Sequence, residues 1–214
     1  TAGAFFASQG VGGTIPRVSS TGGVDNDSVI VGGLGGSNFG GTVTNSYWDR
    51  QTSGMTRGIG RNNGGTGLTT VQARSQASFA GFDFSGTWAI YEGQTNPLLR
   101  AFLTPLTVTA NDATHTYDGS AWSGGNGLSY STPPGAGLLG TVVFGGTSQG
   151  ATAEGTYSIT AGGLYSAQQG YLITYAPGTL TIAAAPPPGP GPTPPPPAAP
   201  PAAPAGGGTT GAPY

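Results

Sequence analysis

The chain has 214 residues, which is enough for one or two small domains. It carries six Arg, no Lys and eight acidic residues for a net charge of −2, without a basic cluster, so nucleic acid is not an expected partner. It has no Cys, which excludes zinc fingers, disulfide frameworks and thiol nucleophiles, and no apolar run approaches the about 18 residues of a membrane-spanning helix.

Glycine and proline dominate the composition, with 42 Gly and 19 Pro, but their distribution is uneven. Most of the Pro residues follow Ala185, so the earlier part is Gly-rich and still holds short runs of Val, Ile, Leu and aromatic residues. Such a chain can bury a core only from short strands joined by many turns. Low charge together with no disulfide is typical of exported bacterial β-proteins. The start at Thr1 without Met suggests a mature form or a piece of a longer protein.

Regular glycine pairs punctuate residues 1–66, at positions 12–13, 22–23 and 32–33 and then at 40–41. Short β-branched pieces lie between them at residues 14–15, 29–31 and 42–44. This pattern predicts a stacked array of short strands, a β-solenoid, although an irregular Gly-rich surface would give similar punctuation. Asp25 and Asp27 resemble a fragment of a calcium loop but lack the later Glu, so a turn is expected there.

The stretch NSYWDRQTSG at residues 45–54 ends this array and is unusually rich in aromatic and charged residues. We expect Tyr47 and Trp48 to fill or cover the core of the last coil, because buried aromatic residues contribute large apolar areas. Asp49 and Arg50 should lie in the turn beyond. There a local pair between them, or hydrogen bonds to backbone N–H groups, would hold the chain where it leaves the array.

Residues 67–104 are expected to cap the array. Thr69 and Gln72 have the spacing of a capping box, which predicts one short helix over residues 70–79. A strand at residues 88–91 and a return to the core at residues 98–99 should come next. The residues that we expect to form the cap and core are Tyr47, Trp48, Phe79, Trp88, Ile90 and Leu98.

Residues 105–183 should form a second β unit, a small antiparallel β-sandwich or β-grasp-like module that begins at Pro105. Residues 106–110 alternate apolar and polar side chains. The segment YLITYAPGTLTI predicts a hairpin in which Pro177 and Gly178 occupy a type II turn, and Asp118 with Gly119 indicates another turn. Residues 184–214 are rich in Pro, Gly and Ala and read as a disordered spacer, with a ligand for a PxxP-binding module as the alternative.

Two stretches match catalytic motifs in residue type, but their expected structural context differs from that of the motifs. Ser148 stands in a G-x-S-x-G, but the sequence after it indicates a turn and a strand instead of the helix that a nucleophile elbow needs. His115 and Asp118 supply too few ligands for zinc, and the GAGLLG at residues 135–140 has no βαβ context. We therefore expect no catalytic, cofactor or metal site. The candidate ligand-contact aromatics are Trp122, Tyr117 and Tyr130, although packing in a core is the competing interpretation for such residues.

Three segments together resemble filamentous-haemagglutinin-like adhesins of bacterial two-partner secretion. VGGLGGSNFGGTVTNSYWDRQTSG is similar to the GLUG-type repeat, and the segment from GLTTVQARSQ to NPLLRAFL is similar to the region directly after those repeats. LTVTANDATHTYDGSAWSGGNGLSYS and its continuation to GTLTI resemble the YDG/MBG-type repeat module. The matches cover about residues 11–182.

The resemblance implies a non-enzymatic structural and adhesive segment, without a cofactor, of a large protein that is secreted or displayed on the bacterial surface. It implies an outer-membrane partner transporter for the parent chain, and host or surface glycans or proteins as contacts. The alternative is a carbohydrate- or surface-binding module that uses exposed aromatic residues.

Overall fold

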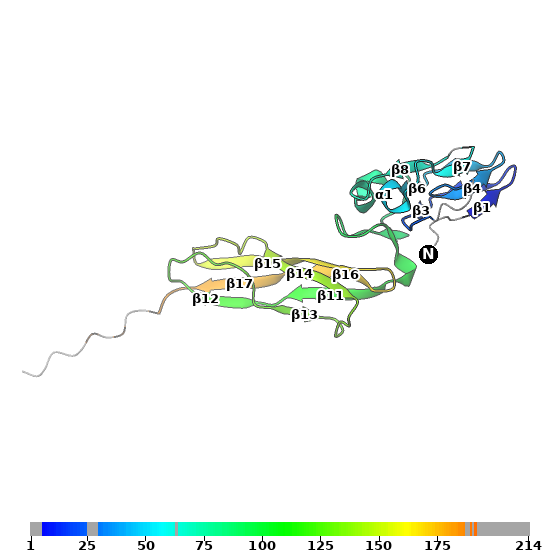
Figure 1. The fold of residues 1–214 in the computed structure, drawn as a ribbon. Helices are drawn as coiled ribbons and strands as arrows, with labels where there is room; N and C mark the ends of the chain where they lie inside the picture. The colour runs from blue at the N-terminus through cyan, green and yellow to red at the C-terminus, as the bar shows by residue number, and fades with distance from the viewer. Residues whose placement is uncertain (1–5, 25–29, 63, 187–188, 190, 192–214) are drawn as a thin grey trace, which may run out of the picture.

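A computed structural model describes residues 6–24, 30–62, 64–186, 189 and 191. Short strands make up most of its regular structure, which confirms the all-β prediction. Figure 1 shows the strands in two groups, β1–β8 and β11–β17, joined by residues 67–104. Asp25, Asp27, part of the predicted strand at residues 29–31 and nearly all of the Pro-rich segment lie outside the described residues.

The first group consists of three short parallel sheets. Their strand orders are β1-β4-β7, β2-β5 and β3-β6-β8. The strands are β1 (Phe6–Gln9), β2 (Thr14–Pro16), β3 (Ser19–Ser20), β4 (Gly35–Asn38), β5 (Thr42–Thr44), β6 (Tyr47–Asp49), β7 (Ile59–Arg61) and β8 (Thr66–Leu68).

The register of these sheets differs from the glycine spacing. Thr14 lies beside Thr42 and Ser19 beside Tyr47, so in both pairs the partner is 28 residues further along the chain. The ten-residue spacing of the glycine pairs is therefore not the spacing of paired strands. Some of these glycines serve a different purpose, because Gly33 lies directly against the indole of Trp48 and a Cβ there would overlap it. Close approach between backbone and ring explains the glycine better than strand punctuation.

The predicted helix over residues 70–79 is wrong. The chain forms two 3₁₀ turns instead, η1 (Gln72–Arg74) and η2 (Gln76–Ser78), separated by Ser75 in an extended conformation. The capping-box bonds do form, since Thr69 N–H donates to Gln72 Oε1 over 2.9 Å. Long-range bonds end the turn, because Glu92 Oε1 accepts from Gln76 N–H over 2.8 Å. Tertiary hydrogen bonds thus override the local helix signal.

Two other helical turns and one strand pair lie between the two groups of strands or at the end of the first group. The helix that the sequence did not predict is α1 (Arg50–Ser53), directly after β6. Strands β9 (Trp88–Ala89) and β10 (Leu98–Leu99) pair antiparallel and lead into η3 (Arg100–Phe102). In the described part of the chain, no helix is long and apolar enough to cross a membrane.

The second group forms two sheets with strand orders β13-β11-β16 and β12-β17-β15-β14. Its strands are β11 (Thr104–Ala110), β12 (Ala113–Thr116), β13 (Leu128–Tyr130), β14 (Leu138–Gly145), β15 (Gly155–Ser166), β16 (Tyr171–Ala176) and β17 (Gly178–Ala183). Pairs β11–β13, β14–β15 and β15–β17 are antiparallel as expected, whereas β11–β16 and β12–β17 are parallel, so both sheets are mixed and the purely antiparallel prediction is corrected. Pro105, the expected start of the module, is the second residue of β11 and pairs with Leu172.

The Pro177–Gly178 hairpin is also wrong. Strands β16 and β17 belong to different sheets, and the chain passes from one sheet to the other through Pro177. Gly178 is buried, and a Cβ there would collide with the backbone carbonyl of Ala110. The glycine therefore permits a close approach between chain segments and does not serve a left-handed turn.

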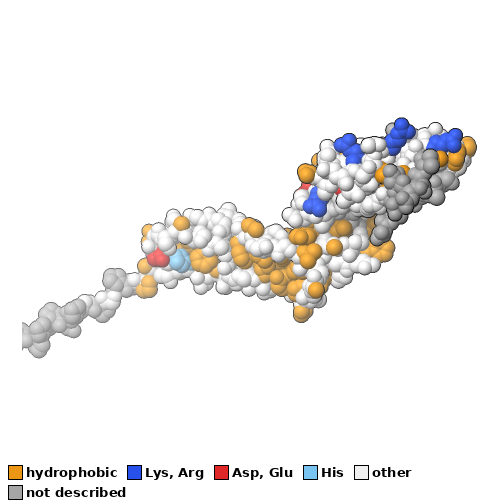
Figure 2. Space-filling model, viewed as in Figure 1, with side chains coloured by type: hydrophobic (Ala, Val, Ile, Leu, Met, Phe, Trp, Pro, Cys, Tyr) orange, Lys and Arg blue, Asp and Glu red, His pale blue; other side chains and the backbone are white. Residues whose placement is uncertain are grey.

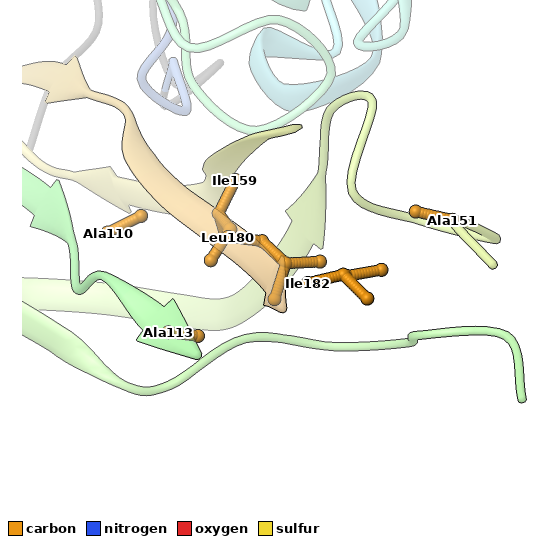
Figure 3. Close-up of a cluster of buried hydrophobic side chains, with 6 residues drawn as sticks. All are labelled: Ala110, Ala113, Ala151, Ile159, Leu180 and Ile182. Atoms are coloured by element: carbon orange, nitrogen blue, oxygen red, sulfur yellow. The ribbon is translucent and has the colours of Figure 1, made fainter. Parts of the chain in front are cut away.

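Two apolar clusters fill this module. In β11 the expected alternation is confirmed, since Leu106 and Val108 are buried while Thr107 is exposed. These two residues pack with Leu164 of β15 in one cluster. Figure 3 shows the other cluster, in which Leu180 and Ile182 of β17 lie beside Ile159 of β15; the remaining labelled members are Ala110, Ala113 and Ala151.

Candidate functional site

The stretch NSYWDRQTSG lies where the first group of strands meets residues 67–104. Tyr47 and Trp48, expected in the core, are 6% and 5% exposed. The Tyr47 ring meets Phe79 edge-on at 5.1 Å between centroids, and its hydroxyl donates to the Ala80 carbonyl over 2.9 Å. Trp48 Nε1–H donates to the Met55 carbonyl over 3.1 Å. Both polar tips are thus paired inside an apolar environment, as buried Tyr and Trp require.

The other residues expected in the cap and core fall into two clusters. Phe79 is buried beside Tyr47, and Trp88 and Ile90 pack half-buried against the same cluster. Leu98 is buried in a separate cluster with Ala89 and Leu103. Residues 67–104 therefore contact both the end of the first strand group and the start of the module.

Asp49 organises the turn after β6. Its side chain caps α1: Oδ1 accepts from Gln51 N–H over 2.8 Å and from Thr52 N–H over 3.2 Å, and Oδ2 accepts from the Thr70 hydroxyl over 2.8 Å. Burial alone would raise the pKa of Asp49, but these hydrogen bonds to the charged form outweigh it and hold the pKa below the usual value. The expected hydrogen bonds to backbone N–H groups are confirmed, and the alternative of an ion pair with Arg50 does not form.

Arg50 forms no ion pair with this buried carboxylate and is exposed. It lines an open depression of about 300 Å³, and its aliphatic stem lies across Gly67 of β8, where a Cβ would come within 2.6 Å of Arg50 Cδ. The depression is lined by Arg50, Gln51, Gly54, Met55, Thr56 and Thr69. Sequence reasoning did not identify this place. The local signal for α1 was readable, since Asp49 and Gly54 are a typical N-cap and C-terminal glycine.

The candidate ligand-contact aromatics do not converge on one surface. Trp122 packs half-buried against the cluster of Ile159 and Leu180, whereas Tyr130 packs half-buried against the cluster of Leu106 and Val108. Tyr117 is exposed. The indole N–H of Trp122 is buried without a hydrogen-bond partner among the described residues, which is the one unusual polar feature of the three.

His115 and Asp118 form a local turn. His115 Nε2 lies 3.2 Å from Asp118 Oδ1, which also accepts from Ser120 N–H over 2.8 Å. The Ser120 hydroxyl and amide lower the pKa of Asp118 to about 2. Across the described ranges, no group of three His, Cys, Asp or Glu residues is placed to hold a metal ion.

Ser148 is fully buried in the turn after β14. Its hydroxyl accepts from Gln149 Nε2 over 3.0 Å and donates to the Gly145 carbonyl over 3.4 Å. The hydroxyl is therefore engaged in closing the turn. This surrounding differs from the exposed tip of a strand-to-helix turn, which is where an elbow nucleophile stands.

Comparison with known proteins gives one relative. Part of the chain is similar to Halomucin of Haloquadratum walsbyi, with 30% identity over 126 residues. The match covers 48% of this chain and 1% of that protein, so the chain spans a very small share of the relative's length. No protein-family model matches, and no solved structure matches.

Proposed function

We propose that the chain is a non-enzymatic structural and adhesive segment of a large secreted or surface-displayed protein of the filamentous-haemagglutinin-like type. In this proposal residues 1–66 form a short β-solenoid with GLUG-like repeats, residues 67–104 cap it, and residues 105–183 add a YDG/MBG-type β module. The unit gives reach and offers contact surface to a host or other surface.

The observation that carries the proposal is the repeated parallel pairing of short strands in all three sheets of the first group. Two different strand pairs, β2–β5 and β3–β6, share the spacing of 28 residues, and the third sheet is parallel too. A chain that winds in coils places successive strands in parallel register in this way. Gly35 and Ser37 of β4, the central strand of its sheet, are buried, as small residues between neighbouring coils of a shaft would be.

The junction between cap and module supports a mechanical role. The Tyr91 hydroxyl donates to the Tyr171 carbonyl over 2.6 Å and accepts from Ile173 N–H over 3.0 Å. The Gln168 side chain accepts from Leu99 N–H over 2.9 Å and donates to Leu99 O over 3.0 Å, as a neighbouring strand would. Four hydrogen bonds therefore join the two parts, which favours a stiff connection.

Location and partners belong to the same proposal. The resemblance to two-partner-secretion adhesins favours the bacterial cell surface and an outer-membrane transporter for the parent protein. The similarity to a small part of a very long protein, Halomucin, is consistent with a piece of a long repeat-containing chain.

Surface display tests this function. Bacteria that carry the chain on an outer-membrane anchor should be retained under flow on protein- or glycan-coated surfaces, compared with cells that carry the anchor alone. A display control with Trp48→Ala should lose retention, because it removes the core of the proposed coil. Equal retention of cells with and without the chain on every surface would contradict an adhesive role.

A carbohydrate-binding module that uses aromatics is the second candidate. Trp122 favours it, because its ring is only partly buried and its indole N–H has no hydrogen-bond partner among the described residues. Glycan binding that Trp122→Phe abolishes, with the fold intact, would support this alternative.

A further inference from the structure

The Arg50 guanidinium is a positioned cation for which the described residues supply no partner. A Cβ on Gly67 would lie 2.6 Å from Arg50 Cδ and 2.7 Å from Cγ, so only glycine lets the stem rest on β8. Within the described residues the guanidinium has no hydrogen bond or ion pair, and the one ion pair there joins His115 and Asp118. Packing of the stem limits the positions of the charged head, which reduces the entropy lost when it binds.

Among the described residues of this part of the chain, the acidic side chains of Asp49, Asp83 and Glu92 have other hydrogen-bond partners. Asp49 caps α1 and binds the Thr70 hydroxyl. Asp83 accepts from Ser85 and from Gly86 N–H, and these bonds lower its pKa to about 2. No carboxylate of the described chain therefore neutralises Arg50. Figure 2 shows Arg side chains only on the part that holds β1–β10, and all six Arg precede residue 105.

The depression beside Arg50 combines polar and apolar lining. Thr56 and Thr69 contribute hydroxyl groups, and Gln51 contributes an amide whose oxygen already accepts from Thr70 N–H over 2.7 Å. Met55 contributes a flexible apolar side chain. A volume of about 300 Å³ is at the small end of ligand pockets, the size of one or two sugar rings.

We propose that this depression binds a carboxylated sugar, such as a uronic acid unit of a polysaccharide. The planar fork of a single Arg suits a carboxylate, which accepts two parallel N–H bonds. The hydroxyls and the Gln51 amide match ring hydroxyl groups, and the Met55 side chain matches the C–H face of the ring. Phosphate-rich polymers fit less well, because they need many cations along a groove and the chain has no Lys.

This inference rests on the proposed adhesive function and gives it a ligand class. It also gives Asp49, Gly67 and Arg50 different roles. Asp49 holds the turn, Gly67 makes room for the stem of Arg50, and Arg50 contacts the ligand.

The probe is oligogalacturonate, with its fully methyl-esterified form as the uncharged match. Calorimetric titration of the whole chain should show binding of the acid and none of the ester. Arg50→Gln should weaken binding about tenfold, the effect of losing a charge-assisted hydrogen bond. Arg61→Gln is the charge-matched control, since Arg61 lies over the Phe39 ring outside the depression, and it should change affinity less than about twofold. Gly67→Ala should also weaken binding while keeping the charge, with thermal unfolding as a check of the fold.

Three results would overturn the inference. One is equal binding of the acid and the ester, and another is no binding of the acid at all. The third is an equal loss of affinity in Arg50→Gln and Arg61→Gln, which would mean general attraction of anions. The proposed adhesive function is tested separately, because retention of displaying cells on other surfaces survives if only this depression fails.

Discussion

Trp48→Ala is the sharpest test of how the first strand group is held together. The indole is 5% exposed and lies against the backbone of Gly33, Gly58 and Gly67. A Cβ on Gly58 would come within 2.6 Å of the ring, and one on Gly67 within 2.8 Å. Glycines have no side chain that could move into the space, so the cavity would remain largely unfilled.

The expected cost has two contributions. Removing a buried Trp side chain costs about 3–5 kcal/mol, with the upper part of the range applying where the site cannot collapse. Loss of the hydrogen bond from Trp48 Nε1 to the Met55 carbonyl adds about 1 kcal/mol. We therefore expect the free energy of unfolding to fall by about 5 kcal/mol, which is a large part of the stability of a typical domain.

Hydrogen exchange during urea titration separates the two parts of the chain. Amides of residues 30–62 should exchange at lower urea in Trp48→Ala, whereas those of β15 and β17 should keep their midpoint. Trp122→Ala is the matched control and should show the reverse pattern, because Trp122 packs in the module. If Trp48→Ala lowers the free energy of unfolding of residues 30–62 by less than about 1 kcal/mol, the ring is not the core of this unit.

Three other sites allow tests of particular contacts. Tyr91→Phe removes both hydrogen bonds of the hydroxyl to β16, so it should cost about 2 kcal/mol and speed exchange of β16 amides, with unchanged exchange refuting a stiff junction. Asp49→Ala should cost about 1 kcal/mol as a lost N-cap in chemical denaturation. Because the folded pKa of Asp49 lies below its unfolded value of about 3.9, its contribution is complete above that value and disappears as pH falls through the folded pKa, and Asp49→Asn should remove this dependence. Gly33→Ala should lower the melting temperature because its Cβ would overlap the Trp48 ring, whereas Gly10→Ala, which meets no atom within 4 Å, should be nearly neutral.

Local patterns in the sequence predicted local features well. The alternation of residues 106–110 predicted which side chains of β11 are buried, and the β-branched residues 42–44 predicted β5. The capping-box spacing of Thr69 and Gln72 predicted their mutual hydrogen bonds. Each of these features depends on residues within a few positions of one another, so the sequence contains the necessary information.

Which strands pair with one another in the sheets could not be predicted from local patterns. The alternation within residues 171–182 fits any neighbouring strand, and Pro177-Gly178 suggested that the two halves pair with each other. Instead β16 pairs with β11, more than 60 residues earlier in the chain, and β17 pairs with β12 and β15. Strand pairing is decided by packing across the whole module, and a dipeptide that fits a turn also fits a crossing between sheets.

The depression at Arg50 likewise depends on long-range contacts that local sequence patterns did not predict. The sequence placed Asp49 and Arg50 together and left open whether they would pair. In the folded chain they do not pair. Asp49 accepts hydrogen bonds from backbone N–H groups and from the Thr70 hydroxyl, and the Arg50 stem rests on Gly67. Among the described residues the guanidinium therefore has no acidic partner, which is the condition that the proposed ligand site needs. That division depends on residues 17 to 21 positions further along the chain, which reach this turn only when β8 pairs with β6.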